Sequence, residues 1–287
     1  GRRGKRSHSF GNQEKGKDML RDITLGQYYP SDSVIHKMDP RVKLFGTIVF
    51  IISLFLFQKI SVYVVATLFL AAVIMISKVP FSFMVKGLKG IFVLMMITVV
   101  FNLFLTPGTT AFAIWKLKVT WEGIRQAAFM AVRLTYLILG SSVLTLTTTP
   151  NNLTDGLEKA LSPLKVIKVP VHEISMMMSI ALRFIPILLD ETDKIMKAQM
   201  ARCADFESGG LIKKAKSLVP LLVPLFISAF RRANDLAMAM EARGYRGGEG
   251  RTKMKPLIYH KRDYIAYGCI VAYMVISIVV GRLPFLP

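Results

Sequence analysis

The sequence is poor in the residues from which metal sites and disulfide frameworks are built. It has two cysteines, Cys203 and Cys269, and four histidines in 287 residues. The cysteines lie far apart, and no cysteine or histidine stands at a zinc-ligand spacing, so we expect neither a disulfide framework nor a metal site. The motifs Gly-x-x-x-x-Gly-Lys-Ser/Thr, His-Glu-x-x-His and Gly-x-Ser-x-Gly are also missing. Their absence argues against an ATP-binding loop, a zinc peptidase site and a serine hydrolase elbow. We therefore expect no catalytic residues and no cofactor bound by this chain.

Acidic residues are scarce too. The chain has 18 Asp and Glu against 38 Lys and Arg, a formal net charge of +20. In a soluble protein this charge suggests nucleic acid binding. Here 53% of the residues are hydrophobic and they gather in long runs, which is typical of membrane proteins with basic cytoplasmic loops. We predict a multi-pass protein of the cell membrane that contacts the lipid bilayer and no nucleic acid.

The apolar runs predict an all-α fold with about five transmembrane helices. The run 44–77 is too long for a single crossing of a bilayer core about 30 Å thick, so it is interpreted as two short helices that turn at Gln58-Lys59. Three more helices are expected at 88–105, 124–147 and 264–280. Basic residues before the first helix, and between the second and third, place the N-terminus in the cytoplasm.

These helices divide the chain into five predicted segments. Residues 1–18 are a polar, basic extension that we expect to be disordered, and 19–43 form an N-terminal cytoplasmic segment. A four-helix transmembrane region spans 44–147, and 263–287 hold the C-terminal transmembrane helix. The loop 106–121 between the third and fourth helices is expected outside the cell.

The remaining segment, 148–262, is predicted to hold long cytoplasmic or interfacial helices. A spanning helix at 172–189 would place a stretch rich in Lys and Arg outside the cell, against the positive-inside rule. A compensating span at 218–230 would be too short and would contain two prolines. The methionines of this segment suit either an adaptable helix-binding surface or ordinary core and lipid-facing packing. Asp190, Glu191 and Asp193 face several directions on a helix, so most of these three residues are expected to be simply solvated.

Both long helices end in the pattern Ala-x-x-Ala-Arg followed by a small residue. The copies are 198–203 and 239–244, and a proline, Pro186 or Pro224, precedes each one inside its helix. An arginine in the last turn is favourable in the helix dipole, and its planar guanidinium can bind a carboxylate through two hydrogen bonds. One copy is usually a solvated arginine. Two copies at consecutive helix ends indicate a duplicated binding socket on a partner.

Arg133 is a candidate intramembrane charge. It lies about 12 residues beyond Trp121, about 18 Å along a helix. A charge at the bilayer centre costs roughly 2.5–3.5 kcal/mol on insertion scales. Arg133 is therefore expected to contact a polar group such as Asn102, or a partner protein. Alternatively, the helix starts later and Arg133 lies near the membrane surface.

These features resemble the T component (EcfT family), the transmembrane coupling subunit of energy-coupling factor (ECF) transporters. The resemblance covers nearly the whole chain from Met19, and it rests on the segments 26–43 and 182–186 and on the two tails. The family pattern in both tails is Ala-Arg-Gly. Ala242-Arg243-Gly244 matches it, and Ala201-Arg202-Cys203 departs from it at the last position.

The resemblance implies an importer in a bacterial plasma membrane, with two P-loop ATPase subunits and a substrate-binding membrane S component as partners. The ATPases would bind ATP and Mg, and their movement would pass through the two long cytoplasmic helices to the S component for uptake of a vitamin or other micronutrient. The implied ATPase-docking residues are Ala201, Arg202, Cys203, Ala242, Arg243 and Gly244. The S-component contact candidates are Met176, Met177, Phe184, Pro186, Leu222 and Phe226.

The alternative is a stand-alone secondary transporter. Such a protein needs polar or charged groups that converge near the membrane midplane on broken helices. The first three predicted helices contain almost none. An integral-membrane enzyme would need a cluster of histidines or carboxylates near one face, and the sequence shows none.

Overall fold

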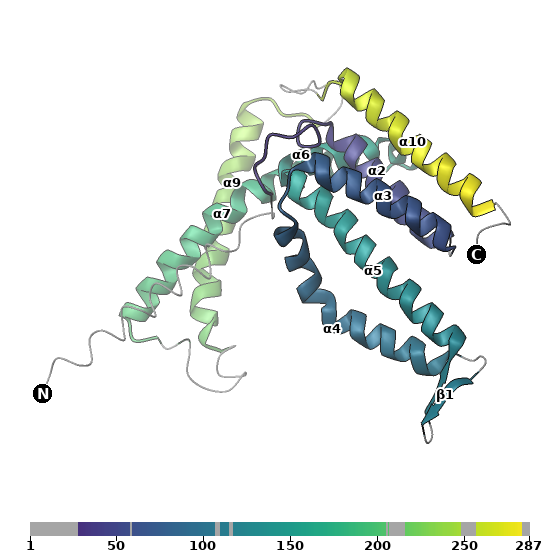
Figure 1. Cartoon of the computed structure of the whole chain (residues 1–287). Helices are drawn as coiled ribbons and strands as arrows, with labels where there is room; N and C mark the ends of the chain where they lie inside the picture. Colours follow the sequence, from purple (N-terminus) through teal and green to yellow (C-terminus); the bar gives the residue numbers. More distant parts are fainter. Residues whose placement is uncertain are drawn as a thin grey trace, which may run out of the picture. The chain divides into compact units, whose positions relative to one another are not determined.

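The computed structural model describes residues 28–57, 59–106, 110–114, 117–204, 206, 216–247 and 257–282. The regular secondary structure of these residues is helical apart from one short hairpin (Figure 1). The predicted extension 1–18 lies outside the described residues. The chain divides into two compact units. We call Gly26–Ala160 with Lys255–Pro287 the bundle unit, and we call the unit that contains Leu161–Met254 the α7–α9 unit.

The first two helices of the bundle unit confirm the predicted turn in the run 44–77. They are α2 (Pro40–Leu56) and α3 (Ile60–Ser77). The side chain of Asp39 caps α2 by accepting a hydrogen bond from the N–H of Arg41 at 2.9 Å, and Pro40 suits the first helical position. Helix α3 ends at Ser77, and the residue that caps it, Lys78, adopts a left-handed conformation with φ 55°. Two helices of 17 and 18 residues are each just long enough to cross a bilayer core.

Helices α4 (Phe81–Leu105) and α5 (Trp121–Thr147) pack against each other, and both begin earlier than predicted. The segment between them is not the plain loop that the sequence suggested. It contains strands β1 (Thr110–Ile114) and β2 (Leu117–Thr120), which pair antiparallel. The hairpin lies at the end of the α4–α5 pair (Figure 1).

The junction of β2 with α5 is fixed by Thr120 and Gly123. The Thr120 hydroxyl accepts a hydrogen bond from the Gly123 N–H at 3.1 Å and donates one to the Thr106 carbonyl at 2.9 Å. A Cβ at Gly123 would lie only 3.0 Å from the Leu103 carbonyl oxygen. Glycine therefore allows the start of α5 to lie directly on the end of α4.

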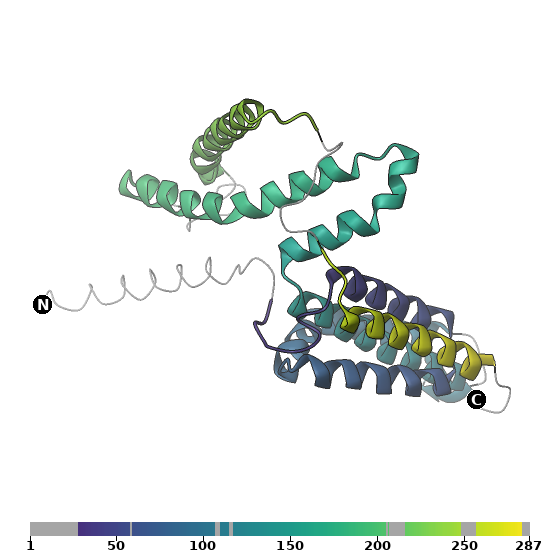
Figure 2. The ribbon, with the colours of Figure 1, turned by 90° about the horizontal axis from the view of Figure 1, so that it is seen from above.

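Two further helices complete the bundle unit. These are α6 (Pro150–Ala160), which packs on α2, and α10 (Lys261–Arg282), which packs on α2 and α3. Figure 2 shows α10 running beside these two helices. The buried core joins side chains from five helices, among them Phe50, Leu70, Met84, Val143 and Tyr273. The Tyr273 hydroxyl also hydrogen-bonds Ser53 on α2 at 2.6 Å, so α10 is joined to α2 by packing and by a buried polar contact.

The α7–α9 unit consists mainly of two long helices. After a short 3₁₀ helix, η1 (Ser162–Ile167), come α7 (Val171–Ala201) and α9 (Val219–Ala242). They have 31 and 24 residues, so they are about 46 and 36 Å long. Pro186 lies inside α7 and Pro224 inside α9. The two helices pack against each other.

Four helices of the described chain are long and apolar enough to cross a membrane: α3, α5, α7 and α10. Helix α2, with 17 residues, is at the lower limit of length for a crossing, and α4 has a shorter apolar stretch, Gly90–Leu103. The predicted class, an all-α membrane protein, is confirmed. Helix α7 qualifies by length and composition alone, so its position at the cytoplasmic interface stays a prediction.

Candidate functional site

The first tip, where α7 ends, is closed by a Schellman motif. The Ala204 N–H donates to the Gln199 carbonyl, and the Cys203 N–H donates to the Met200 carbonyl, each at 3.0 Å. This pair of bonds satisfies carbonyls of the last turn and needs a left-handed residue. Cys203 supplies it with φ 63°, although a side chain in this conformation costs roughly 1–2 kcal/mol. The departure from glycine at this position does not change the form of the cap.

The second tip, where α9 ends, is closed in the same way. The Tyr245 N–H donates to the Met240 carbonyl at 3.0 Å, and the Gly244 N–H donates to the Glu241 carbonyl at 2.9 Å. Gly244 is the left-handed residue, with φ 66°, and a Cβ added there would meet nothing within 4 Å. The requirement for glycine is therefore one of backbone conformation alone. The repeated sequence pattern corresponds to a repeated structure.

Both tip arginines are exposed. Arg202 and Arg243 are the C-cap residues of α7 and α9, with nearly equal φ values of −91° and −87°. Ala201 and Ala242 before them are exposed as well. Neither arginine forms an ion pair with another residue that the structure describes. Each tip therefore presents a free guanidinium that can bind a carboxylate of another protein through two hydrogen bonds.

One ion pair joins α7 to α9. The guanidinium of Arg232 donates to one carboxylate oxygen of Glu191 from Nη2 at 2.9 Å and from Nε at 3.3 Å. The Ser228 hydroxyl donates to the other oxygen at 2.5 Å. Glu191 is therefore an exception among the three acidic residues, most of which are expected to be solvated. Glu191 and Arg232 each stand eleven residues before the arginine of their own tip, about 16 Å along each helix.

A second contact between these helices uses a carbonyl that a proline has freed. Pro224 has no N–H, so the carbonyl of Pro220, four residues earlier, lacks its usual helical donor. The side-chain amide of Gln199 on α7 donates to this carbonyl at 3.5 Å, a long and weak hydrogen bond. The proline inside α9 thus creates an acceptor for α7 near the first tip.

The candidate contact residues for a membrane partner lie on largely open helix faces. Met177, Pro186, Leu222 and Phe226 are exposed, whereas Met176 and Phe184 are half-buried. The Phe226 side chain is 65% exposed, and its ring lies 4.7 Å from that of Phe230, one turn further along α9. Large exposed apolar side chains continue along α9 at Val219, Val223, Ile227 and Met238. A continuous apolar face of this kind requires lipid or another protein to cover it.

Arg133 is buried in the bundle unit and contacts a polar group on a facing helix, which is Tyr63 rather than Asn102. It is 8% exposed, its Nε donates to the Tyr63 hydroxyl at 3.1 Å, and its guanidinium lies 5.4 Å from the Phe55 ring centre. The Asn102 amide instead donates to the Thr98 carbonyl of its own helix at 2.9 Å. The predicted contact with Asn102 is therefore wrong.

The later helix start that the alternative assumed is also wrong, because α5 begins at Trp121. Phe55 is the second-last residue of α2, and Tyr63 lies in the first turn of α3. Arg133 therefore lies level with the turn between α2 and α3. It belongs near one end of these two short helices rather than halfway along them.

A buried carboxylate that the sequence analysis missed joins the starts of α2 and α10. Asp263 is 1% exposed, and its two oxygens accept hydrogen bonds from the backbone N–H groups of Asp39 at 2.9 Å and His260 at 2.8 Å. Next to it, Arg41 donates to the Leu257 carbonyl at 3.1 Å and lies 4.8 Å from the Tyr259 ring centre. No local pattern could reveal partners more than 200 positions apart.

The segment before α2 is tied to the end of α5. The His36 ring lies within hydrogen-bond distance of the Ser33 hydroxyl, at 2.7 Å, and of the Tyr29 carbonyl, at 2.9 Å. Burial lowers the pKa of His36 below its ordinary value. The Lys43 ammonium donates to the carbonyls of Thr147 at 2.8 Å and His36 at 3.3 Å. The polar side chains of the segment 33–43 therefore hold the bundle unit together. Among the described residues, no cluster of His, Cys, Asp and Glu could hold a metal ion.

Comparison with known families defines the class of protein. Residues 31–254 match the CbiQ family, described as a cobalt transport protein. The match covers most of the chain and agrees with the apolar helices of the fold. The fold and the match together define a membrane transport protein.

More similar relatives define the family more closely. The energy-coupling factor transporter transmembrane protein EcfT of Clostridium kluyveri is 57% identical over 262 residues, which are 91% of this chain and 97% of the relative. The proteins of the same name from Ruminiclostridium cellulolyticum and Bacillus subtilis are 53% identical over 256 residues and 49% identical over 246 residues. These matches cover 89% and 85% of this chain and 96% and 93% of the relatives. The chain therefore belongs to the EcfT family, the T components of energy-coupling factor transporters, and the resemblance found in the sequence is confirmed.

Proposed function

We propose that this chain couples ATP hydrolysis in two P-loop ATPase subunits to the movement of a substrate-binding S component. The ATPases bind ATP and Mg, and this chain supplies no catalytic group. The imported substrate is a vitamin or other micronutrient that the S component selects. The N-terminus and the α7–α9 unit lie on the cytoplasmic side of a bacterial plasma membrane.

The observation that supports this proposal most strongly is the duplicated tip. Two helices end in the same hydrogen-bonded cap, and each cap presents an exposed arginine that no described residue pairs. A pair of matching guanidinium groups fits a partner that offers the same acidic socket twice. Two ATPase subunits provide such a pair. The residues that dock are Arg202 and Arg243, with Ala201, Ala242, Cys203 and Gly244 beside them.

The exposed apolar faces of α7 and α9 support the second half of the proposal. Met177, Pro186, Leu222 and Phe226 are exposed, and Met176 and Phe184 lie half-buried beside them. An adaptable apolar surface rich in methionine and phenylalanine suits a partner helix that changes position during transport. The contact between Glu191 and Arg232 links the two helices, so that movement of one tip is passed to the other.

The test is the replacement of each tip arginine by alanine in the assembled transporter. We expect Arg202→Ala and Arg243→Ala each to weaken ATPase binding about 30-fold, the effect of losing an interface residue worth about 2 kcal/mol. The double variant should lose the ATPases on purification. Arg231→Ala is the matched control, because Arg231 is an exposed arginine of α9 away from the tip.

Two results would overturn the proposal. One is an unchanged yield of the complex for the double variant. The other is substrate uptake by this chain alone after reconstitution, which would identify a stand-alone secondary transporter.

A further inference from the structure

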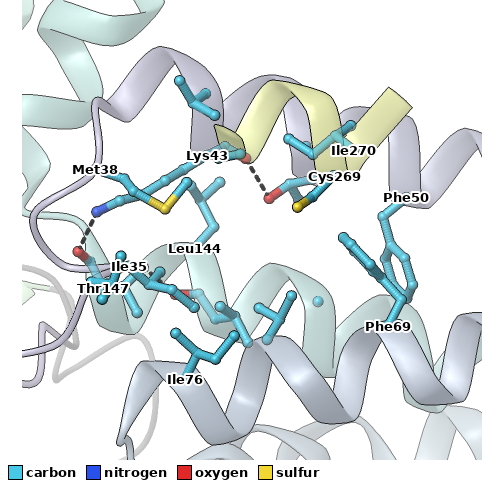
Figure 3. A pocket seen from close by; sticks show the side chains of 18 of the residues that line it. Ile35, Met38, Lys43, Phe50, Phe69, Ile76, Leu144, Thr147, Cys269 and Ile270 are labelled. Atoms are coloured by element: carbon cyan, nitrogen blue, oxygen red, sulfur yellow. Dashed lines mark hydrogen bonds between the residues drawn. The ribbon is translucent and has the colours of Figure 1, made fainter. Parts of the chain in front are cut away.

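A cavity of about 270 Å³ lies in the bundle unit between α2, α3, α5 and α10. Its wall is almost entirely apolar, with Phe50, Phe69, Leu144 and Ile270 contributed by the four helices in turn (Figure 3). The cavity is partly open, and all its lining residues belong to the bundle unit. An apolar wall of this kind favours apolar molecules over water.

The cavity is charged at one end only. Lys43 and Arg262 are its two cationic lining residues. The Lys43 ammonium already donates to two backbone carbonyls. Arg262 differs, because its Nε is shielded from solvent without a hydrogen-bond partner, and its guanidinium forms no ion pair with any described residue. An unpaired guanidinium at the end of an apolar cavity indicates an anionic group that is missing from the isolated chain.

The charged end lies at the ends of the helices. Lys43 is in the first turn of α2, Thr147 is the last residue of α5, and Arg262 is the second residue of α10. Helix ends of spanning segments lie at the level of the lipid headgroups. From Lys43 the cavity extends along α2 as far as Phe50, about 10 Å into the apolar part of the bundle.

We infer that this cavity binds one acyl chain of an anionic phospholipid whose phosphate lies against Arg262. The guanidinium fork matches the oxygens of a phosphate, and the apolar wall matches the hydrocarbon chain. A peptide does not fit, because its backbone N–H and C=O groups would lack partners along this wall. Free phosphate would leave the apolar part of the cavity empty. A zwitterionic lipid would bring its own cation close to Arg262, so phosphatidylglycerol is favoured over phosphatidylcholine.

The experiment measures the lipid that the transporter retains. The complex containing the full chain is exchanged into detergent with an equal mixture of phosphatidylglycerol and phosphatidylcholine, and bound lipids are counted by native mass spectrometry. We expect one tightly retained phosphatidylglycerol. Arg262→Gln should reduce the preference for it about tenfold, the effect of losing a charge-assisted hydrogen-bond pair. Lys261→Gln removes the same charge from the neighbouring exposed residue, which does not line the cavity, and should leave the preference unchanged.

A second pair of variants tests the cavity itself. Ala266 lines it and Gly268 on the same helix does not. Ala266→Phe should fill the cavity and abolish retention of the lipid. Gly268→Phe should not, because nothing lies within 4 Å of a Cβ at that position. Equal loss in Arg262→Gln and Lys261→Gln, retention that survives Ala266→Phe, or displacement of the lipid by inorganic phosphate would each overturn the inference.

Discussion

Glu191 on α7 and Arg232 on α9 form an ion pair of 2.9 Å at matching positions, eleven residues before the arginine that ends each helix. Both side chains are partly exposed, so the pair adds little to folding stability. The position of the pair suggests a mechanical role instead. Each member lies the same number of residues from the tip of its own helix, so the contact is suited to coupling the movements of the two tips.

We predict that Glu191→Gln impairs coupling more than assembly. The variant keeps the shape of the side chain but removes the charge that Arg232 and Ser228 contact. ATPase subunits should still copurify, while substrate uptake per ATP hydrolysed should fall several-fold. The control is Asp235→Asn, which removes an exposed carboxylate of α9 and should behave as the wild type. Weakened assembly in Glu191→Gln would show that the pair is only structural.

Because Cys203 adopts a left-handed backbone conformation, we predict that glycine at this position stabilises the fold. Cys203→Gly should raise the free energy of unfolding by about 0.5–1 kcal/mol, because glycine adopts this conformation without a steric cost. Gly244→Ala should lower it by about 1 kcal/mol, since only backbone strain is introduced there. Thermal unfolding of both variants in detergent checks the signs. A loss of stability in Cys203→Gly would mean that the thiol itself makes a needed contact.

Removal of the Asp263 carboxylate should be costly. Asp263→Asn leaves one of two backbone N–H groups, the buried one of Asp39 or the partly buried one of His260, facing an NH₂ group. An unsatisfied buried donor costs about 1–3 kcal/mol, and we expect thermal stability to fall by this amount. Asp32→Asn is the comparison, because its surface pair with Lys37 should be worth little. Similar small effects at both positions would contradict the role given to Asp263.

His36 predicts a loss of stability in mild acid. Burial lowers its pKa in the folded chain, so the unfolded chain takes up the proton more readily and stability rises with pH in this range. The contribution of His36 is complete above about pH 6.5, the ordinary histidine value, and is lost as the pH falls through the lowered pKa. The thermal midpoint should therefore fall more steeply with acid in the wild type than in His36→Gln. Parallel curves for the two proteins would contradict this.

The sequence was sufficient for features that repeat or depend on length. The break between α2 and α3 followed from a run too long for one crossing, and the two tips followed from one pattern written twice. Helix boundaries were predicted less well. The start of α4 was placed too late, because the helix begins with a basic stretch that the hydropathy pattern excluded. The β1–β2 hairpin was missed because two strands of five and four residues produce a weak signal beside four long apolar runs.

Contacts between distant residues could not be predicted at all. Asp39 caps its own helix α2, but its bond to Asp263 depends on how α10 packs on α2. Arg133 was expected to find a polar partner, and the partner is Tyr63 rather than Asn102. Each pairing is set by which helix faces meet, and local patterns in a single sequence do not reveal that.

The measurement that tests the docking role of the tips most directly is the reactivity of Cys203. This native thiol is exposed at the first tip, beside Arg202, and Gly244→Cys in a Cys203→Gly background reports on the second. We predict that alkylation of either thiol slows at least about tenfold when the ATPases are present, because a docked partner shields the tip. Full alkylation after denaturation gives the reference. Equal alkylation rates with and without the ATPases would contradict docking at these tips.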